Sequence, residues 1–205
     1  MKMLTRLLLA ALLAVMPALA PAIEEPRFEV LRQLGEGVEL RRYAPYVVAE
    51  VVLEAGAAEA GNQAFPILAG YIFGKNKGQR TMAMTAPVTQ TPEPVKMAMT
   101  APVTQSATGS GTRVQFVLPG DVTLDTAPEP LDSRVRLREE PAATWAVIRY
   151  SGTWSQSRYQ AQLAELRAAL ARAGLQADGE PLWARYNGPL TPWFMRRNEV
   201  WLAVR

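Results

Sequence analysis

Histidine and cysteine are both absent from the 205 residues of this chain. Their absence excludes disulfide bonds, Ser-His and Cys-His catalytic dyads, and most protein sites for transition metals. No Gly-rich phosphate-binding motif or cluster of metal-ligating residues is present either. Glu139 and Glu140 are adjacent and on a strand would point to opposite faces, so they do not form a close carboxylate pair. We therefore expect a binding protein with no enzymatic activity and no metal site of its own.

An apolar stretch long enough to span a bilayer comfortably, about 20 residues, is also lacking. The apolar run Leu7–Val15 follows the basic residues Lys2 and Arg6, is closed by Pro17 and precedes small residues that end at Ala22. This order is typical of a secretory signal peptide. We expect cleavage after Ala22 and a periplasmic or secreted product that does not insert stably into a membrane, since no cysteine is present to carry a lipid.

A dense basic surface is the third missing feature. The chain has 22 Lys+Arg and 19 Asp+Glu, and removing residues 1–22 leaves 20 against 19. This balance does not supply the clustered positive charge that nucleic acid binding requires. We expect no nucleic acid partner. Residues 23–205 are enough for one sizeable domain, which must be stabilised by its core.

Apolar periodicity predicts the elements of the first part of the domain. Three strand-like runs come first: Phe28–Leu34, Val38–Tyr43 and Val47–Leu53. A stretch with helical spacing follows and ends at Gly74, a natural helix terminator. Two further strand candidates come next, the methionine-rich region and Val114–Leu118.

The same order of elements recurs later in the chain. Val38–Arg41 aligns with Val135–Arg138, 97 residues later, and a second amphipathic helix follows. We expect this helix to begin with a capping box at Ser157 and Gln160 and to end at Gly174. Two more strand candidates then complete the chain. The sequence therefore predicts an α+β domain of two β-β-α-β-β halves, about 27–118 and 133–205, packed as one unit.

A nine-residue segment, Met-Ala-Met-Thr-Ala-Pro-Val-Thr-Gln, occurs at residues 82–90 and again at 97–105. On a strand, the two methionines of each copy share one face because side chains alternate. Their thioethers would either line a flat apolar ligand, offer a soft axial ligand, or fill the core, and core filling is the more common role. The copies would form a hairpin across residues 91–94, which we favour, or one copy would be a loop insertion.

Several segments together match the pattern of a known family. They are Leu-Arg-Arg-Tyr-Ala-Pro-Tyr at 40–46, Tyr-Ile-Phe-Gly-Lys-Asn at 71–76, Met-Thr-Ala-Pro-Val at 84–88, Phe-Val-Leu-Pro at 116–119 and Pro-Glu-Pro at 128–130. With these segments the chain resembles the SOUL, or haem-binding-protein, family over essentially all of residues 23–205. The resemblance implies an α+β, barrel-like fold in which two helices pack on curved antiparallel sheets. It also implies non-covalent binding of haem or another tetrapyrrole in a shallow apolar groove bordered by the first helix and nearby loops.

Iron ligation in such a groove differs from the histidine ligation proposed for some members of that family. Histidine and cysteine are two of the four familiar haem ligands, and this chain has neither. If haem is the ligand, either the iron has no protein ligand or a methionine, tyrosine or lysine takes that place.

Ten residues are candidates for the tetrapyrrole site: an apolar helix face, basic residues after the helix that would pair with propionates, and the repeated methionines. They are Phe65, Leu68, Tyr71, Ile72, Lys75, Arg80, Met82, Met84, Met97 and Met99. A buried helix face and a solvated basic loop are the ordinary alternatives. We expect a tetrapyrrole-binding role in buffering, transport or sensing. The alternative is an effector- or protein-interaction module that uses the groove for another hydrophobic ligand or partner.

Overall fold

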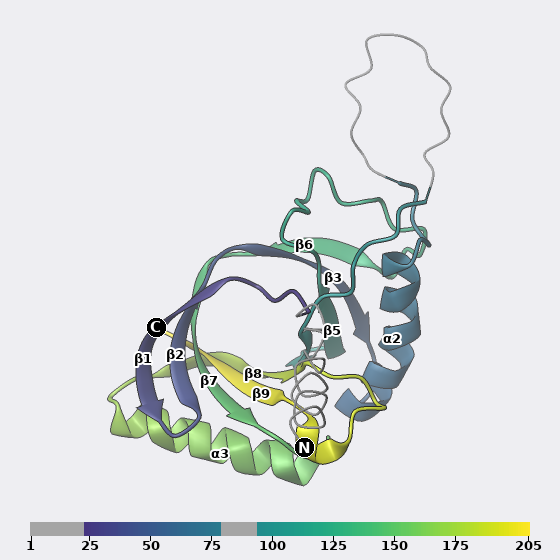
Figure 1. Cartoon of the computed structure of the whole chain (residues 1–205). Helices are drawn as coiled ribbons and strands as arrows, with labels where there is room; N and C mark the ends of the chain where they lie inside the picture. Colours follow the sequence, from purple (N-terminus) through teal and green to yellow (C-terminus); the bar gives the residue numbers. More distant parts are fainter. Residues whose placement is uncertain (1–22, 79–93) are drawn as a thin grey trace, which may run out of the picture.

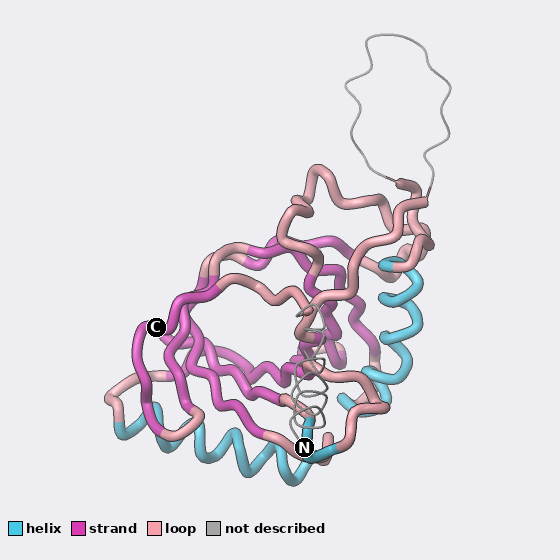
Figure 2. Tube along the Cα trace, in the orientation of Figure 1, coloured by secondary structure: helices cyan, strands magenta, loops and turns pink. Residues whose placement is uncertain are grey.

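A computed structural model describes residues 23–78 and 94–205, and in this part of the chain nine antiparallel strands form one curved, open sheet (Figure 1). The predicted α+β fold is confirmed. The strands are β1 (Phe28–Gly35), β2 (Val38–Tyr43), β3 (Tyr46–Leu53), β4 (Val103–Thr108), β5 (Gly111–Val117), β6 (Arg136–Glu140), β7 (Ala143–Tyr150), β8 (Ala177–Arg185) and β9 (Asn198–Val204). Two helices, α2 (Ala57–Ile72) and α3 (Gln156–Arg172), pack on the outer side of the curve, and a short 3-10 turn, η1, covers Trp193–Met195 (Figure 2).

The order of strands in the sheet, β1-β2-β7-β9-β8-β4-β5-β3-β6, intermixes the two parts of the chain. Strand β2 pairs with β7, and β6 pairs with β3, so each part lends one strand to the other. The two parts also meet where β4 pairs with β8, over only three residue pairs. Because these pairings join segments far apart in sequence, the sheet is one continuous unit that positions both helices.

Both helices end near the predicted glycines, whose backbone takes the left-handed conformation that glycine tolerates best. Gly74 has φ 112° and Gly174 has φ 68°. The start of α3 differs from the expectation. Ser155 is its N-cap, and the Ser155 hydroxyl accepts a hydrogen bond from the backbone N–H of Arg158. The cap therefore lies two residues before the predicted Ser157, because Ser155 has the extended backbone that capping requires.

The outer face of the sheet forms two apolar layers, one under each helix. Val47, Ala49 and Val51 of β3 pack against α2, and residues such as Val200 and Leu202 of β9 pack against α3. Alternate residues of the same strands face the inner side, as the two-residue period of a strand requires. No helix among the described residues is long and apolar enough to cross a membrane.

The inner side of the sheet holds a buried polar network around Glu199 of β9. The Glu199 carboxylate is 0% exposed and accepts hydrogen bonds from Arg41, Tyr186, Arg197 and Trp201. Burial alone would lower the pKa of Arg41, but the Glu199 charge together with Tyr43 and Glu39 outweighs burial and holds that pKa above its usual value. Burial, helped by Glu199, raises the pKa of Tyr186. The network is therefore one charge-balanced unit with the carboxylate at its centre.

The second methionine-rich copy does not form the expected hairpin strand. Only its last three residues, Val103–Gln105, are in a strand, β4, which pairs with β5 and β8, so the favoured hairpin of the two copies is wrong. The first copy, residues 82–90, lies outside the described residues. The backbone N–H of Met97 donates to the carbonyl of Ile72 (2.9 Å), and that of Ala101 donates to Glu24 (2.9 Å). These donors are satisfied by the end of α2 and by the N-terminal segment, which takes the place of a strand ladder.

Candidate functional site

One flank of α2 carries a half-exposed apolar stripe. Gly61, Phe65, Ala69 and Phe73 are spaced four residues apart, which places them one above the other along the helix. Phe65 is 46% exposed and Phe73 is 55% exposed, although both rings are large and apolar. The Phe65 ring also meets Phe116 of β5 edge-on, with centroids 5.4 Å apart. Large apolar side chains that share one exposed flank indicate a binding surface. We call this flank the α2 strip.

Three of the predicted helix residues lie beneath the α2 strip and are not exposed to solvent. Leu68, Tyr71 and Ile72 are buried in the core between α2 and the sheet. The Tyr71 hydroxyl donates to the carbonyl of Pro128 (2.9 Å), so its polar end is used internally. Helical spacing correctly identifies the core-facing side of α2, and for that reason these three residues do not offer the ligand wall proposed for them. Phe65, at the margin of the apolar face, is the exposed member of the set.

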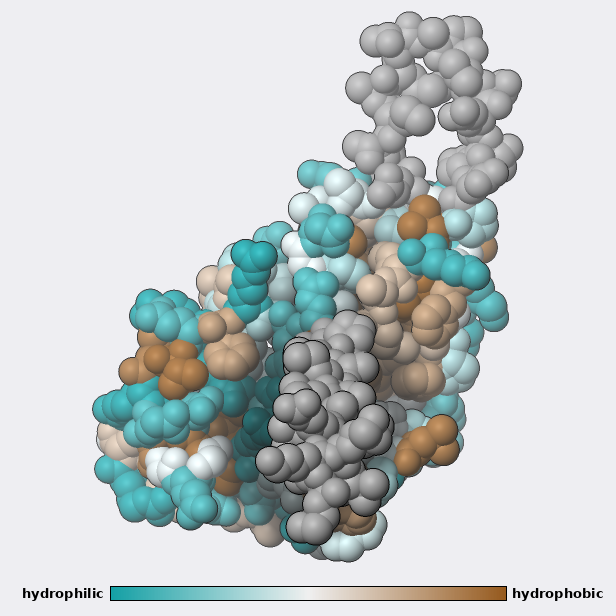
Figure 3. Space-filling view, viewed as in Figure 1, coloured by the Kyte–Doolittle hydropathy of each residue, from teal (hydrophilic) through white to brown (hydrophobic). Residues whose placement is uncertain are grey.

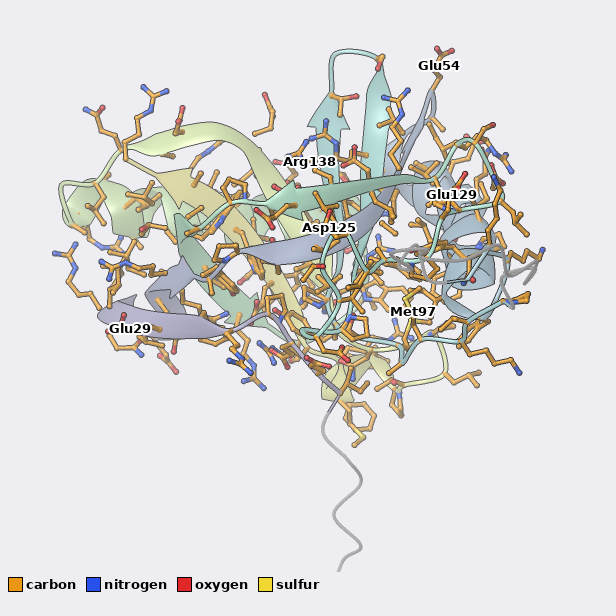
Figure 4. The ribbon with its side chains drawn as sticks, turned by 90° about the horizontal axis from the view of Figure 1, so that it is seen from above. Glu29, Glu54, Met97, Asp125, Glu129 and Arg138 are labelled. Carbon is orange, nitrogen blue, oxygen red and sulfur yellow. The ribbon has the colours of Figure 1, made fainter. Side chains whose placement is uncertain are left out.

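The methionines Met97 and Met99 lie in the extended segment 94–102, which runs beside α2. They are half-buried and pack on the core cluster of α2, whereas Lys96 and Ala98 between them are exposed. The alternation expected for an extended chain is therefore present without a strand. Figure 4 labels Met97 and Figure 3 shows apolar residues gathered over α2 and its neighbouring segment. Arg80, Met82 and Met84 lie outside the described residues.

The side chain that holds this segment against α2 is Asn76, which was not among the predicted site residues. Its amide donates to the carbonyls of Tyr71 (3.0 Å) and Val95 (2.8 Å). Its oxygen accepts the backbone N–H groups of Gly78 (3.1 Å) and Val95 (2.9 Å). Asn76 is 1% exposed, so each of these bonds is shielded from water. The only indication in the sequence was an asparagine two residues after a helix-ending glycine. That pattern indicates an ordinary turn as readily as a side chain that holds two segments together.

Basic residues lie at the Phe73 end of the α2 strip. Lys75 is exposed, and its backbone N–H donates to the carbonyl of Gly70 (2.8 Å), while its aliphatic stem lies over that glycine. The Lys77 ammonium is 2.7 Å from the Glu129 carboxylate, so its charge is already paired. Of the two, Lys75 is the better placed to meet an acidic group on a ligand.

A second cation lies at the opposite end of the α2 strip, where sequence reasoning gave no indication of one. Arg185, the last residue of β8, approaches Gly61: a Cβ atom at Gly61 would lie 3.8 Å from Nη1 of Arg185. The loop that follows β8 carries exposed apolar side chains, Leu190, Trp193, Phe194 and Met195. The α2 strip is thus bounded by a cation at each end.

Comparison with known proteins identifies the family. A sequence model described as "SOUL heme-binding protein" matches residues 23–203, nearly the whole described chain. The chain belongs to the SOUL haem-binding family. The SOUL relatives include "Heme-binding protein 2" of Homo sapiens, 30% identical over 193 residues, with 92% of this chain and 89% of that protein covered. "Heme-binding protein 1" of Sus scrofa is 26% identical, with 71% of each chain covered.

Solved structures of low sequence identity share the fold of this SOUL chain. The EcmrR C-terminal domain superposes with a TM-score of 0.55 at 12% identity, covering 82% of this chain and 96% of that one. A hydrolase from Listeria innocua gives a TM-score of 0.53 at 13% identity, with 82% and 91% covered. At these identities the likeness concerns architecture alone, since one fold supports many functions.

The residues present suit the ligand class of the SOUL family. A tetrapyrrole is flat and apolar over its faces, and haem carries acidic propionates at one edge. The α2 strip offers exposed aromatic rings, with a cation at each end. Among the described residues no group of three or more acidic side chains is arranged to hold a metal ion. Non-covalent contact with the macrocycle is the mode of binding that this surface supports.

Proposed function

We propose that the chain binds haem or a related tetrapyrrole on the α2 strip and serves in buffering, transport or sensing of that pigment. The observation that carries the proposal is the exposure of Phe65 and Phe73 on one flank of α2 in a member of a haem-binding family. Burial of the apolar faces of the macrocycle against these rings and the neighbouring methionines would supply the driving force. Binding that remains reversible suits a buffer or carrier better than a permanent prosthetic group.

Iron is expected to contribute little to the affinity, because no histidine or cysteine is available to ligate it. Haem and iron-free protoporphyrin should therefore both bind residues 23–205 saturably, with dissociation constants within about tenfold of each other, a difference below about 1.4 kcal/mol. Difference-absorption titration measures both. Binding of haem alone would point to axial ligation, whereas no spectral change with either pigment would reject the proposal and favour the interaction-module alternative.

The location of the site is tested in the same titration. Phe65→Ala and Phe73→Ala should each weaken protoporphyrin binding by about tenfold, the loss expected for one well-buried aromatic contact. Val30→Ala is the matched control, since Val30 is an exposed apolar residue on the edge strand β1, away from α2 (Figure 1). Equal affinities for all three variants would place the pigment elsewhere on the protein.

We also propose that residues 1–22 direct export and are removed after Ala22. Their basic start, apolar run and small-residue end support this. Expression of the full chain in a Gram-negative host should yield a periplasmic protein whose first residue is Ile23. N-terminal sequencing and mass measurement of the periplasmic fraction check this outcome. Recovery of the uncut chain from the cytoplasm would contradict it.

A further inference from the structure

Arg185 holds a guanidinium between two indole rings on the outer side of the sheet. Its central carbon lies 4.2 Å from the ring centroid of Trp183 and 5.0 Å from that of Trp154. The side chain is half-buried at the end of β8, close to the flank of α2 at Gly61. Two aromatic faces stabilise a cation, but they do not neutralise its charge. The arrangement therefore fixes the position of a charged group.

The charge on Arg185 lacks a counter-ion within the described part of the chain. None of the ion pairs there involves Arg185, and its buried Nε has no hydrogen-bond partner. A charged neighbour has the same sign: the Arg196 guanidinium lies 4.1 Å from the centroid of the same Trp154 ring, and its charge acts on Arg185. Burial, opposed by Tyr150 and reinforced by Arg196, lowers the pKa of Arg185 to about 10, so it stays charged at neutral pH.

Arg41 and Arg197 pair with carboxylates and Arg196 donates to the backbone carbonyls of Thr191 and Pro189, whereas Arg185 makes no such bond among the described residues. Arg41 contacts both Glu39 (2.7 Å) and Glu199 (3.2 Å), and Arg197 contacts Glu25 (2.6 Å) as well as Glu199. A partly buried cation without such a partner is energetically unfavourable unless an anion arrives from outside. Arg185 is therefore available to pair with an anionic group of a ligand.

The neighbourhood of Arg185 is continuous with the α2 strip. The absence of a side chain at Gly61 lets Gln105 and Arg185 approach the helix closely, since a Cβ there would lie 2.4 Å from Nε2 of Gln105 and 3.8 Å from Nη1 of Arg185. Phe65 is one helical turn further along, about 6 Å at 1.5 Å per residue. A flat ligand that covers Phe65 and extends past Gly61 and Gln105 would bring an acidic substituent close to Arg185. Planar guanidinium and carboxylate groups match each other in bidentate contacts.

We propose that Arg185 receives a carboxylate of the ligand, so that the α2 strip selects tetrapyrroles with a free acid side chain. This inference rests on the proposed function, because it concerns an edge substituent of a macrocycle bound on the strip. Arg185 acts as a specificity-determining residue, and Trp154 and Trp183 hold its guanidinium in place. Lys75, at the Phe73 end, is the competing cation, and its distance from Arg185 along the helix allows the two to be tested separately.

The test compares protoporphyrin with its dimethyl ester, which has the same macrocycle but no acid. We expect the unmodified protein to bind the acid at least about tenfold more tightly than the ester. Arg185→Gln should remove this preference by weakening acid binding and leaving ester binding unchanged. Lys75→Ala tests the competing cation, and Arg172→Gln, which makes the same change at an exposed arginine at the end of α3, is the matched control; both should keep the preference. A preference that survives Arg185→Gln, or one that disappears in Lys75→Ala, overturns the assignment.

Failure of the inference and failure of the proposed function give different results. Equal binding of acid and ester by the unmodified protein rejects the role of Arg185 alone, while binding of neither pigment rejects both. Folding of the variant is checked by urea denaturation. Its midpoint should be unchanged or higher in Arg185→Gln, because an unpaired buried charge is removed. A clearly lower midpoint would assign Arg185 a structural role through Trp154 and Trp183.

Discussion

Replacing Glu199 by alanine should lower the free energy of unfolding by about 3–5 kcal/mol, the loss typical of a buried ion pair from which one partner is removed. The carboxylate is inaccessible to water and accepts bonds from Arg41 (3.2 Å), Tyr186 (2.7 Å) and Trp201 (2.8 Å). Without it, Arg41 would remain buried with only the partly exposed Glu39 as a counter-charge. Urea denaturation followed by far-ultraviolet circular dichroism measures the change.

Asp178→Ala is the matched control for Glu199→Ala. Asp178 also pairs with an arginine at 2.7 Å, but both partners, Asp178 and Arg205, are exposed. Exposed pairs contribute about 1 kcal/mol or less because water screens them. A Glu199 variant that loses no more stability than the Asp178 variant would mean that the inner network rearranges around the missing carboxylate. It would also show that the network is not what holds β2 and β9 together on the inner side.

Local patterns in the sequence were sufficient to predict the elements but not their partners. Partial alternation predicted β1 and β2, a β-branched run predicted β3, and helical spacing closed by a C-terminal glycine predicted α2 and α3. The exchange of strands, β2 with β7 and β6 with β3, was not predictable in this way. Pairing depends on how whole faces pack, and a strand carries the same alternation beside either neighbour.

The candidate site was predictable only in part, for a related reason. A helical apolar stripe identifies the side that faces the core, so the strongest members of that stripe, such as Leu68 and Tyr71, are buried. Exposed residues at the margin lie one position from a buried one: Phe65 follows the buried Ala64 and is turned about 100° around the helix from it. No feature of the sequence indicated that Arg185 belongs to the site. What sets it apart is its contact with two tryptophan rings without a carboxylate partner, and that is a property of the folded chain.

Asn76→Ala should both destabilise the protein and weaken tetrapyrrole binding, because Asn76 joins the end of α2 to the segment that carries Met97 and Met99. The change leaves the carbonyl of Val95 and the backbone N–H groups of Val95 and Gly78 without this partner, while the carbonyl of Tyr71 keeps the N–H of Gly74. At about 1–3 kcal/mol for each buried group that stays unsatisfied, and with some groups recovering water, we expect a loss of about 2–4 kcal/mol. Urea denaturation and protoporphyrin titration measure the two effects.

Asn62→Ala is the control for general effects of removing an asparagine, since Asn62 lies exposed on the same helix. It should change neither the midpoint nor the affinity. Asn76→Asp separates the two halves of the clamp: the carboxylate can still accept from Val95 and Gly78, but it cannot donate to the two carbonyls. If donation is what fixes the segment, Asn76→Asp should bind pigment as weakly as Asn76→Ala. If the hydrogen bond from Met97 to Ile72 were enough to hold the segment, both Asn76 variants would bind pigment as tightly as the unmodified protein.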